Sequence, residues 1–168
     1  SGRAVEHAHG MVAAGAHLVD VGGESTRPGS EPVGEAEERA RVLPVVRALA
    51  RALPVPISID TRRASVAEAA LDEGAHLVND ISALRDDPRL AEVVADHGAG
   101  LVLMHMQGTP RTMQREPRYR DVVAEVRDFL AGRLAAAIDA GIDPECLALD
   151  PGFGFGKTYA HTLRLLRC

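Results

Sequence analysis

The chain has 168 residues, the size of one domain. Its 19 basic and 24 acidic side chains give a formal net charge of −5. This charge disfavours nucleic-acid binding, which requires a clustered basic face. Hydrophobic residues make up 46% and charged residues 26%, the balance of a soluble globular protein. No apolar run approaches the ~20 residues that span a bilayer, and two cysteines build no disulfide framework, so we expect a cytoplasmic protein with no membrane or nucleic-acid partner.

Short apolar segments and amphipathic segments alternate along the chain. In chain order, we predict a helix at 3–14, a strand at 16–21, a helix at 34–53, a strand at 55–59, a helix at 64–73, a strand at 75–78, a helix at 87–97, a strand at 100–104, a helix at 119–140, a strand at 146–149 and a helix from about 159. Glycines after several of these helices are expected to end them. Pro44 predicts a kink or an early break in its helix.

The predicted strands are apolar without polar alternation, which indicates a parallel sheet covered by helices, and therefore an α/β fold. Five strands in 168 residues suit an open flavodoxin-like sheet, whereas a barrel needs ~200 residues or more. All five strands nevertheless end in polar or glycine-rich sequence. Strands ~4.8 Å apart would spread these ends over roughly 19 Å in an open sheet, whereas a barrel gathers them at one mouth. The pattern favours a TIM (β/α)8 barrel, with the open sheet as the alternative.

The glycine-rich run at 152–158 is not a phosphate-binding loop, because Pro151 stands where that motif needs its first glycine. We expect its backbone to approach a flat ligand closely, with Phe153 or Phe155 available for stacking. A merely structural turn is the alternative. The methionines around His105, at the end of another strand, are either core or a ligand wall.

Asp60, Asn79 and Asp150 each end an apolar strand, where a polar group is partly desolvated unless it binds something. Together they would form an acceptor-rich pocket for a heterocycle that presents N–H and NH₂ groups. Arg27, in the loop at 25–29, supplies a guanidinium suited to a carboxylate or phosphate. The alternative is that the two aspartates cap the following helices. The seven histidines show no metal-ligand spacing, so we assign no metal site.

Five segments resemble the dihydropteroate synthase family in order and spacing. They are DVGGESTRPG (20–29), ISIDT (57–61), VNDI (78–81), LMHMQG (103–108) and LDPGFGFGK (149–157). The resemblance covers essentially the whole chain. It implies a (β/α)8 barrel of which residues 1–168 hold about strands two to six, that is, a pterin-binding domain truncated at both ends.

The resemblance also implies an activity, the condensation of 6-hydroxymethyl-7,8-dihydropterin pyrophosphate with p-aminobenzoate. The products are 7,8-dihydropteroate and pyrophosphate in folate biosynthesis, with Mg²⁺ assisting the leaving group and sulfonamides as inhibitors. Asp60 would be catalytic, stabilising a pterin methylene cation electrostatically. The substrate-binding residues that the resemblance implies are Thr26 and Arg27 for p-aminobenzoate, and Asp60, Asn79, Ile81, Met104, Asp150, Gly154 and Phe155 for the pterin.

Three parts of the family pattern do not occur in this sequence: an Asn-containing first strand that meets metal and pyrophosphate, a Ser-Arg-Lys segment and an Arg-x-His motif. We therefore expect the main Mg²⁺ ligands outside this chain, an inactive isolated fragment, and a possible homodimer of the full-length parent. One alternative is a pterin-binding barrel of the methyltetrahydrofolate:corrinoid methyltransferase type, which the loop at 25–29 disfavours because in the synthases it serves p-aminobenzoate. The other is a non-catalytic pterin-binding fragment, which two unpaired sheet edges disfavour.

Overall fold

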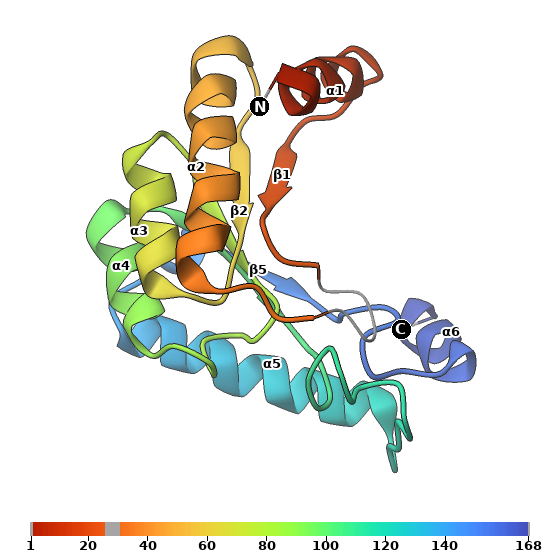
Figure 1. Cartoon of the computed structure of the whole chain (residues 1–168). Coiled ribbons are helices and arrows are strands. Elements are labelled where there is room, and N and C mark those ends of the chain that lie inside the picture. Colours follow the sequence, from red (N-terminus) through yellow and green to blue (C-terminus); the bar gives the residue numbers. More distant parts are fainter. Residues whose placement is uncertain (1, 26–30, 168) are drawn as a thin grey trace.

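A computed structural model describes residues 2–25 and 31–167, in which helices and strands alternate along the chain (Figure 1). The elements are α1 (Gly2–Ala13), β1 (Val19–Gly22), α2 (Glu35–Ala52), β2 (Ile57–Asp60), α3 (Ala64–Asp72), β3 (Leu77–Asp80), α4 (Arg89–His97), β4 (Gly100–Met104), α5 (Val122–Asp139), a 3₁₀ turn (Pro144–Cys146), β5 (Leu147–Asp150) and α6 (Tyr159–Leu166). None of the described helices is long and apolar enough to cross a membrane.

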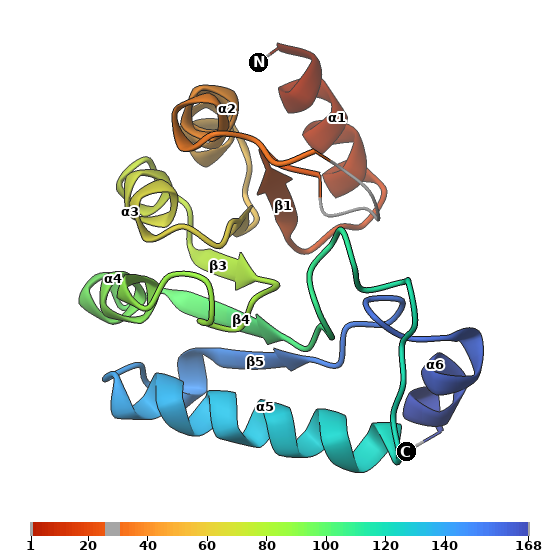
Figure 2. The same ribbon diagram turned by 60° about the horizontal axis from the view of Figure 1, so that its bottom comes forward.

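The five strands form one parallel sheet in the order β1-β2-β3-β4-β5. A flavodoxin-like sheet would instead place the second strand outside the first, so the open-sheet alternative is wrong. Each strand follows its predecessor on the same side, as in a (β/α)8 barrel. Figure 2 shows the strands fanning around an inner space while α2, α3, α4 and α5 lie outside them. The described sheet is therefore part of such a barrel.

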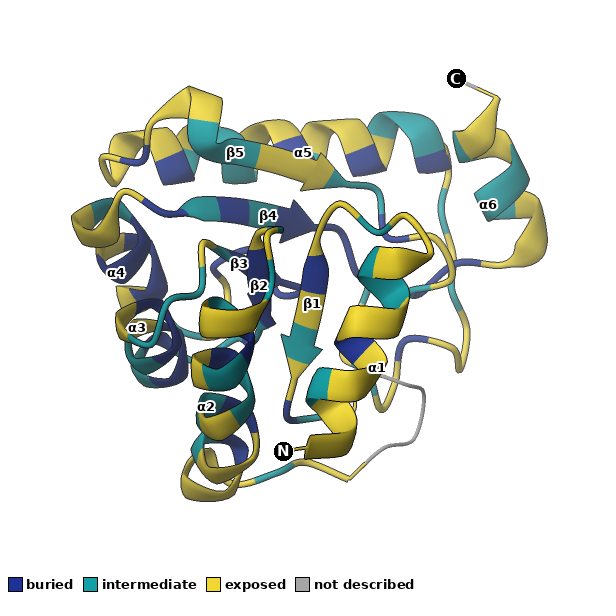
Figure 3. Ribbon diagram, turned by 90° about the horizontal axis from the view of Figure 1, so that it is seen from above, coloured by how far each residue is buried: buried dark blue, intermediate teal, exposed yellow. Residues whose placement is uncertain are grey.

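The main core lies between the sheet and the outer helices. Ile59, Val78 and Leu103 of the strands are fully buried against Val66 and Val94 of the helices. The buried residues in Figure 3 accordingly line the sheet and the helix faces turned toward it. A separate apolar cluster, described with the site below, lies at the carboxyl ends of the strands. The fold thus keeps its packing core outside the sheet and leaves the inner mouth for other chemistry.

Every strand except β4 begins later than predicted, and the reason is clearest for β1, which begins at Val19, and β3, which begins at Leu77. The amide of Ala16 donates to the carbonyl of Met11 at 3.0 Å, and the amide of Ala75 donates to that of Ala70 at 2.9 Å. These bonds are the closing bonds of helix C-termini, so the residues still belong to the helix ends. An apolar sequence alone does not separate such a turn from the strand that follows.

Helix α2 runs unbroken through Pro44, so the early break does not occur. Proline removes one hydrogen bond from a helix interior and strains the preceding turn. Val42, Val46 and Leu49 of the same helix are fully buried, and this packing offsets that cost. Pro44 itself faces solvent.

Candidate active site

Polar side chains gather where the strands end. Register pairs Gly22 with Asp60 and Asp60 with Asn79 on neighbouring strands. The Nδ2 of Asn79 donates to Oδ2 of Asp20 at 3.4 Å, so an Asp20 carboxylate reaches across the end of β2. Asp20 was not among the predicted site residues, although a carboxylate inside an apolar strand is the same signal that marked Asp60. The structure therefore brings the two predicted side chains, Asp60 and Asn79, together with that of Asp20.

The pKa of Asp60 is raised to about 7. Burial is the main cause, and the carboxylates of Asp20, Glu38 and Asp80 add repulsion, while the guanidinium of Arg62 opposes the shift. Asp60 therefore titrates near neutral pH. A positive charge developing beside it would favour its ionised form and would be stabilised in turn.

Asp150 ends β5 and lies opposite Met104 in the register. Its Oδ1 accepts a hydrogen bond from the amide of Gly152 at 2.7 Å, which closes the first turn of the glycine-rich loop. The predicted alternative of helix capping does not hold for either aspartate. The first amide of α3 donates to Asp87, at 2.8 Å, and α6 is capped by Thr158.

An apolar wall lies beside these carboxylates, since its residue Ile81 lines one pocket together with Asp60. Ile81, Met104, Met106 and Met113 are buried together, with Phe155 packed against them. The methionines around His105 are thus a wall at the mouth and not part of the main core. Ile81, Met104 and Phe155 were predicted here, whereas Met113 was missed because it lies in a loop without periodicity. Methionine adapts its shape readily, which suits a wall for a flat ring.

The glycine-rich loop approaches the protein itself more closely than expected. Gly152 has φ 65°, and a Cβ there would collide with the carbonyl oxygen of His105; a Cβ on Gly156 would lie 2.8 Å from the carbonyl oxygen of Gln107. Gly152 and Gly156 therefore serve the close approach of this loop to the segment after β4, and the expected approach of the loop to a flat ligand stays a prediction. Gly154 alone of the three has open space beside it. Phe153 is exposed, which leaves Phe155 as the wall.

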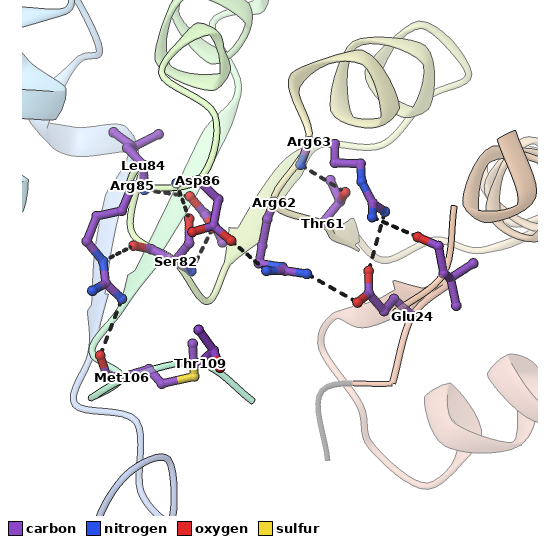
Figure 4. A network of polar contacts seen from close by, with 12 residues as sticks. Glu24, Thr61, Arg62, Arg63, Ser82, Leu84, Arg85, Asp86, Met106 and Thr109 are labelled. Carbon is purple, nitrogen blue, oxygen red and sulfur yellow. Dashed lines mark hydrogen bonds and ion pairs between the residues drawn. The ribbon is translucent and has the colours of Figure 1, made fainter. Parts of the chain in front are cut away.

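A network of ion pairs ties the loops after the strands to one another (Figure 4). Arg62 donates to Glu24 at 3.2 Å and to Asp86 at 2.5 Å, linking the loops after β1, β2 and β3. Arg85 donates to the carbonyls of Ser82 at 2.8 Å and Met106 at 3.3 Å, linking the loops after β3 and β4. Sequence reasoning missed this network, because its partners are far apart along the chain.

Buried Glu38 of α2 anchors the loop after β2. Thr61 donates to its carboxylate at 2.7 Å, and Arg63 pairs with it as well. Arg63 also donates to the carbonyl of Val33 at 2.7 Å, just beyond the residues 26–30 that the structure does not describe. Thr26 and Arg27, predicted for p-aminobenzoate, lie outside the described residues.

No three His, Cys, Asp or Glu side chains within residues 2–25 and 31–167 converge as metal ligands.

The sequential parallel sheet and the pocket at its carboxyl edge define part of a TIM-barrel enzyme. The family model described as "Pterin binding enzyme" matches residues 1–168, and the chain belongs to this family. The acceptor side chains and the methionine wall are consistent with a pterin, a flat ring that carries N–H and NH₂ groups.

The relatives are more specific. The dihydropteroate synthase of Synechocystis sp. is 46% identical over 164 residues, covering 98% of this chain and 57% of the relative. The Yersinia pestis dihydropteroate synthase, solved with a sulfonamide drug complex, superposes with a TM-score of 0.93 at 47% identity over 97% of this chain and 59% of that one. The Xanthomonas albilineans dihydropteroate synthase, solved with 4-aminobenzoic acid, superposes with a TM-score of 0.90 at 46% identity, over 97% of this chain and 57% of that one. The chain thus spans 57% to 59% of the length of these three proteins.

Proposed function

We propose that the full-length protein is a dihydropteroate synthase and that this chain carries the pterin side of its active site. The observation that carries the proposal is the pairing of Asp20, Asp60 and Asn79 with the wall of Ile81, Met104 and Phe155 at one edge of the sheet. The chain is similar to dihydropteroate synthases along 97% to 98% of its length, which supports this activity over others in the pterin-binding family.

The pterin would lie between the two sides of this pocket. Its N–H and NH₂ groups would donate to the oxygens of Asp60, Asn79 and Asp150, because these half-buried acceptors would lose water to the bound ring and need donors in its place. Its ring would pack on Met104 and Phe155, with Gly154 leaving room beside it. Thr26 and Arg27 would contribute to the p-aminobenzoate side.

The reaction substitutes one bond at the pterin methylene carbon. The C–O bond to the diphosphate breaks and its electron pair leaves with pyrophosphate, which produces a methylene cation that the pterin ring stabilises. The amine of p-aminobenzoate then forms the C–N bond and loses a proton. Asp60, poised to ionise near neutral pH, would stabilise the cation from the pocket floor.

Three further expectations belong to the full-length protein. Mg²⁺ would assist departure of pyrophosphate, and a rate that does not change with added Mg²⁺ after chelation would contradict this. A homodimer would appear as twice the chain mass in sedimentation. Cell fractionation would place the protein in the cytoplasm.

The experiment that tests the proposal incubates the full-length protein with both substrates and separates the products by chromatography. We expect 7,8-dihydropteroate to form only when both substrates are present, and a sulfonamide to compete with p-aminobenzoate. Methyl transfer from methyltetrahydrofolate in place of this reaction would establish the corrinoid-methyltransferase alternative. Pterin binding with neither activity would establish a non-catalytic binding protein.

A further inference from the structure

Lys157 is the only lysine in a chain that otherwise uses arginine for every fixed positive charge. It is buried, with 4% of its surface exposed. Its Nζ lies 2.8 Å from Nδ1 of His105 and donates to the carbonyls of Gly152, Phe155 and His105 at 3.0, 3.1 and 3.2 Å. A compact ammonium can direct its three N–H groups at acceptors on several sides, whereas the planar fork of arginine cannot.

These contacts join the two loops that flank the pterin wall. His105 is the first residue after β4, next to Met104. Gly152 and Phe155 belong to the loop after β5, and Phe155 packs on the methionine wall. The amide of His105 also donates to the carbonyl of Asp150 at 2.9 Å, so the two strands leave the sheet side by side. Lys157 closes the junction just beyond them.

The protonation states agree with this geometry. Burial, with the charge of Lys157 as a second cause, lowers the pKa of His105 to about 4, so its ring is neutral and Nδ1 can accept a hydrogen bond. Burial lowers the pKa of Lys157 to about 8, while the charge of Asp150 opposes the shift. At neutral pH the amine therefore remains mostly protonated, and its three N–H groups are shared among four acceptors.

We propose that Lys157 is a positioning residue, which holds the glycine-rich loop against the end of β4 and thereby fixes Phe155 and Asp150 for the pterin. The proposal rests on the proposed function for the identity of the substrate. Without the ammonium, three buried carbonyls and one ring nitrogen lose their donor, and the loop must move to hydrate them. Lys157 acts through Phe155 and Asp150 and is not assigned a contact with substrate.

The test compares Lys157→Met and Lys157→Arg with the unaltered full-length protein. We expect both substitutions to raise the KM for the pterin substrate by about tenfold or more, because small displacements of positioning groups have large effects. The KM for p-aminobenzoate should stay the same. The affinity for 6-hydroxymethylpterin, measured by calorimetry, should fall by the same factor as the pterin KM rises. Unchanged pterin affinity in a folded Lys157→Met protein would overturn the proposal.

Arg39→Met is the matched control. Arg39 donates to the carbonyl of Ser65 at 2.7 Å and so joins α2 to α3 on the outer layer, and it is not among the residues that form the apolar wall. Its loss also removes a cation from a cross-element hydrogen bond, and we expect lower stability with unchanged pterin affinity. A loss of pterin affinity equal to that of Lys157→Met would show a general effect of stability and overturn the proposal.

A second measurement applies even if Lys157→Met does not fold. The unaltered protein is treated with an amine-acetylating reagent, and the peptide that carries Lys157 is followed by mass spectrometry. We expect modification to require opening of the loop, and 6-hydroxymethylpterin to slow it because the ligand binds the closed loop. Modification at the rate of the urea-unfolded chain, or a rate insensitive to the pterin, would contradict the proposal. A protein that binds pterin but makes no dihydropteroate would contradict the proposed function alone, since calorimetry and labelling need no turnover.

Discussion

Asp60 is half-buried near the carboxylates of Asp20, Glu38 and Asp80, and its pKa is raised from an ordinary value of 3.8 to about 7. A folded-state pKa above the unfolded value means that the folded protein keeps a proton that the unfolded chain has lost. Stability is therefore lost as the pH rises from about 4 to about 7. The buried position of Asp60 thus lowers the stability of the folded protein, and in return the carboxyl group titrates near neutral pH.

The first prediction follows from this titration. Asp60→Asn removes the ionisable group while keeping its shape, so its melting temperature should exceed that of the unaltered protein at pH 8. The two proteins should melt alike near pH 3, below the unfolded pKa of 3.8, where Asp60 is mostly protonated in both the folded and the unfolded chain. Scanning calorimetry across this range measures the difference. A difference that does not grow with pH would mean that Asp60 ionises normally.

At the scale of elements, one carboxylate serves two helices. Asp87 accepts from the amide of Ala64 at 2.8 Å at the start of α3 and from that of Arg89 at 3.1 Å at the start of α4. The bond to α3 was not predicted, because Ala64 lies 23 residues from Asp87 along the chain. Asp87 thus fixes the spacing of two helices that cover the sheet.

Asp87→Ala should therefore destabilise the protein more than loss of an ordinary cap, by about 2–3 kcal/mol against about 1 kcal/mol. Asp121→Ala is the control, because Asp121 caps one helix, α5, through the amides of Val123 and Ala124, and its ion pair with Arg164 at 3.5 Å is exposed and therefore weak. Urea unfolding measures both free energies. Equal losses in the two variants would rule out a shared role for Asp87.

Alanine substitutions of the glycines in the loop after β5 should lower the stability of the protein by different amounts. Gly152→Ala places a Cβ against the carbonyl of His105, whereas Gly154→Ala meets no neighbour and carries only the strain of φ 82°. We expect about 1 kcal/mol of destabilisation for Gly154→Ala and clearly more for Gly152→Ala. Thermal melts of the two variants give the comparison, and a Gly154→Ala protein less stable than Gly152→Ala would show that the backbone approach to β4 is misassigned.

At the scale of the whole molecule, cationic side chains link every neighbouring pair of loops from β1 to β5. Arg62 spans the loops after β1, β2 and β3, Arg85 spans those after β3 and β4, and Lys157 spans those after β4 and β5. These charged side chains connect all the loops at the mouth, and we expect them to hold the pocket between the loops rigid.

The sequence was sufficient for the α/β class and for the positions of most elements, because apolar periodicity and helix-ending glycines act locally. The polar strand ends and the family resemblance favoured the barrel over the open sheet, and this prediction is confirmed by the strand order, which depends on pairing between distant segments. Asp60, Asn79 and Ile81 were found from strand ends and from resemblance. Lys157 was not, because its burial depends on acceptors from His105, 52 residues away. Asp20 carried the right signal and was overlooked.

The central claim is tested most directly by the rate at which the full-length protein forms 7,8-dihydropteroate, measured side by side with Asp60→Asn. The account predicts product that requires both substrates, and a kcat lower by about a hundredfold or more in a variant that is still folded, since a group that stabilises developing charge is removed. Absence of dihydropteroate from the unaltered protein, or equal turnover in Asp60→Asn, would contradict it.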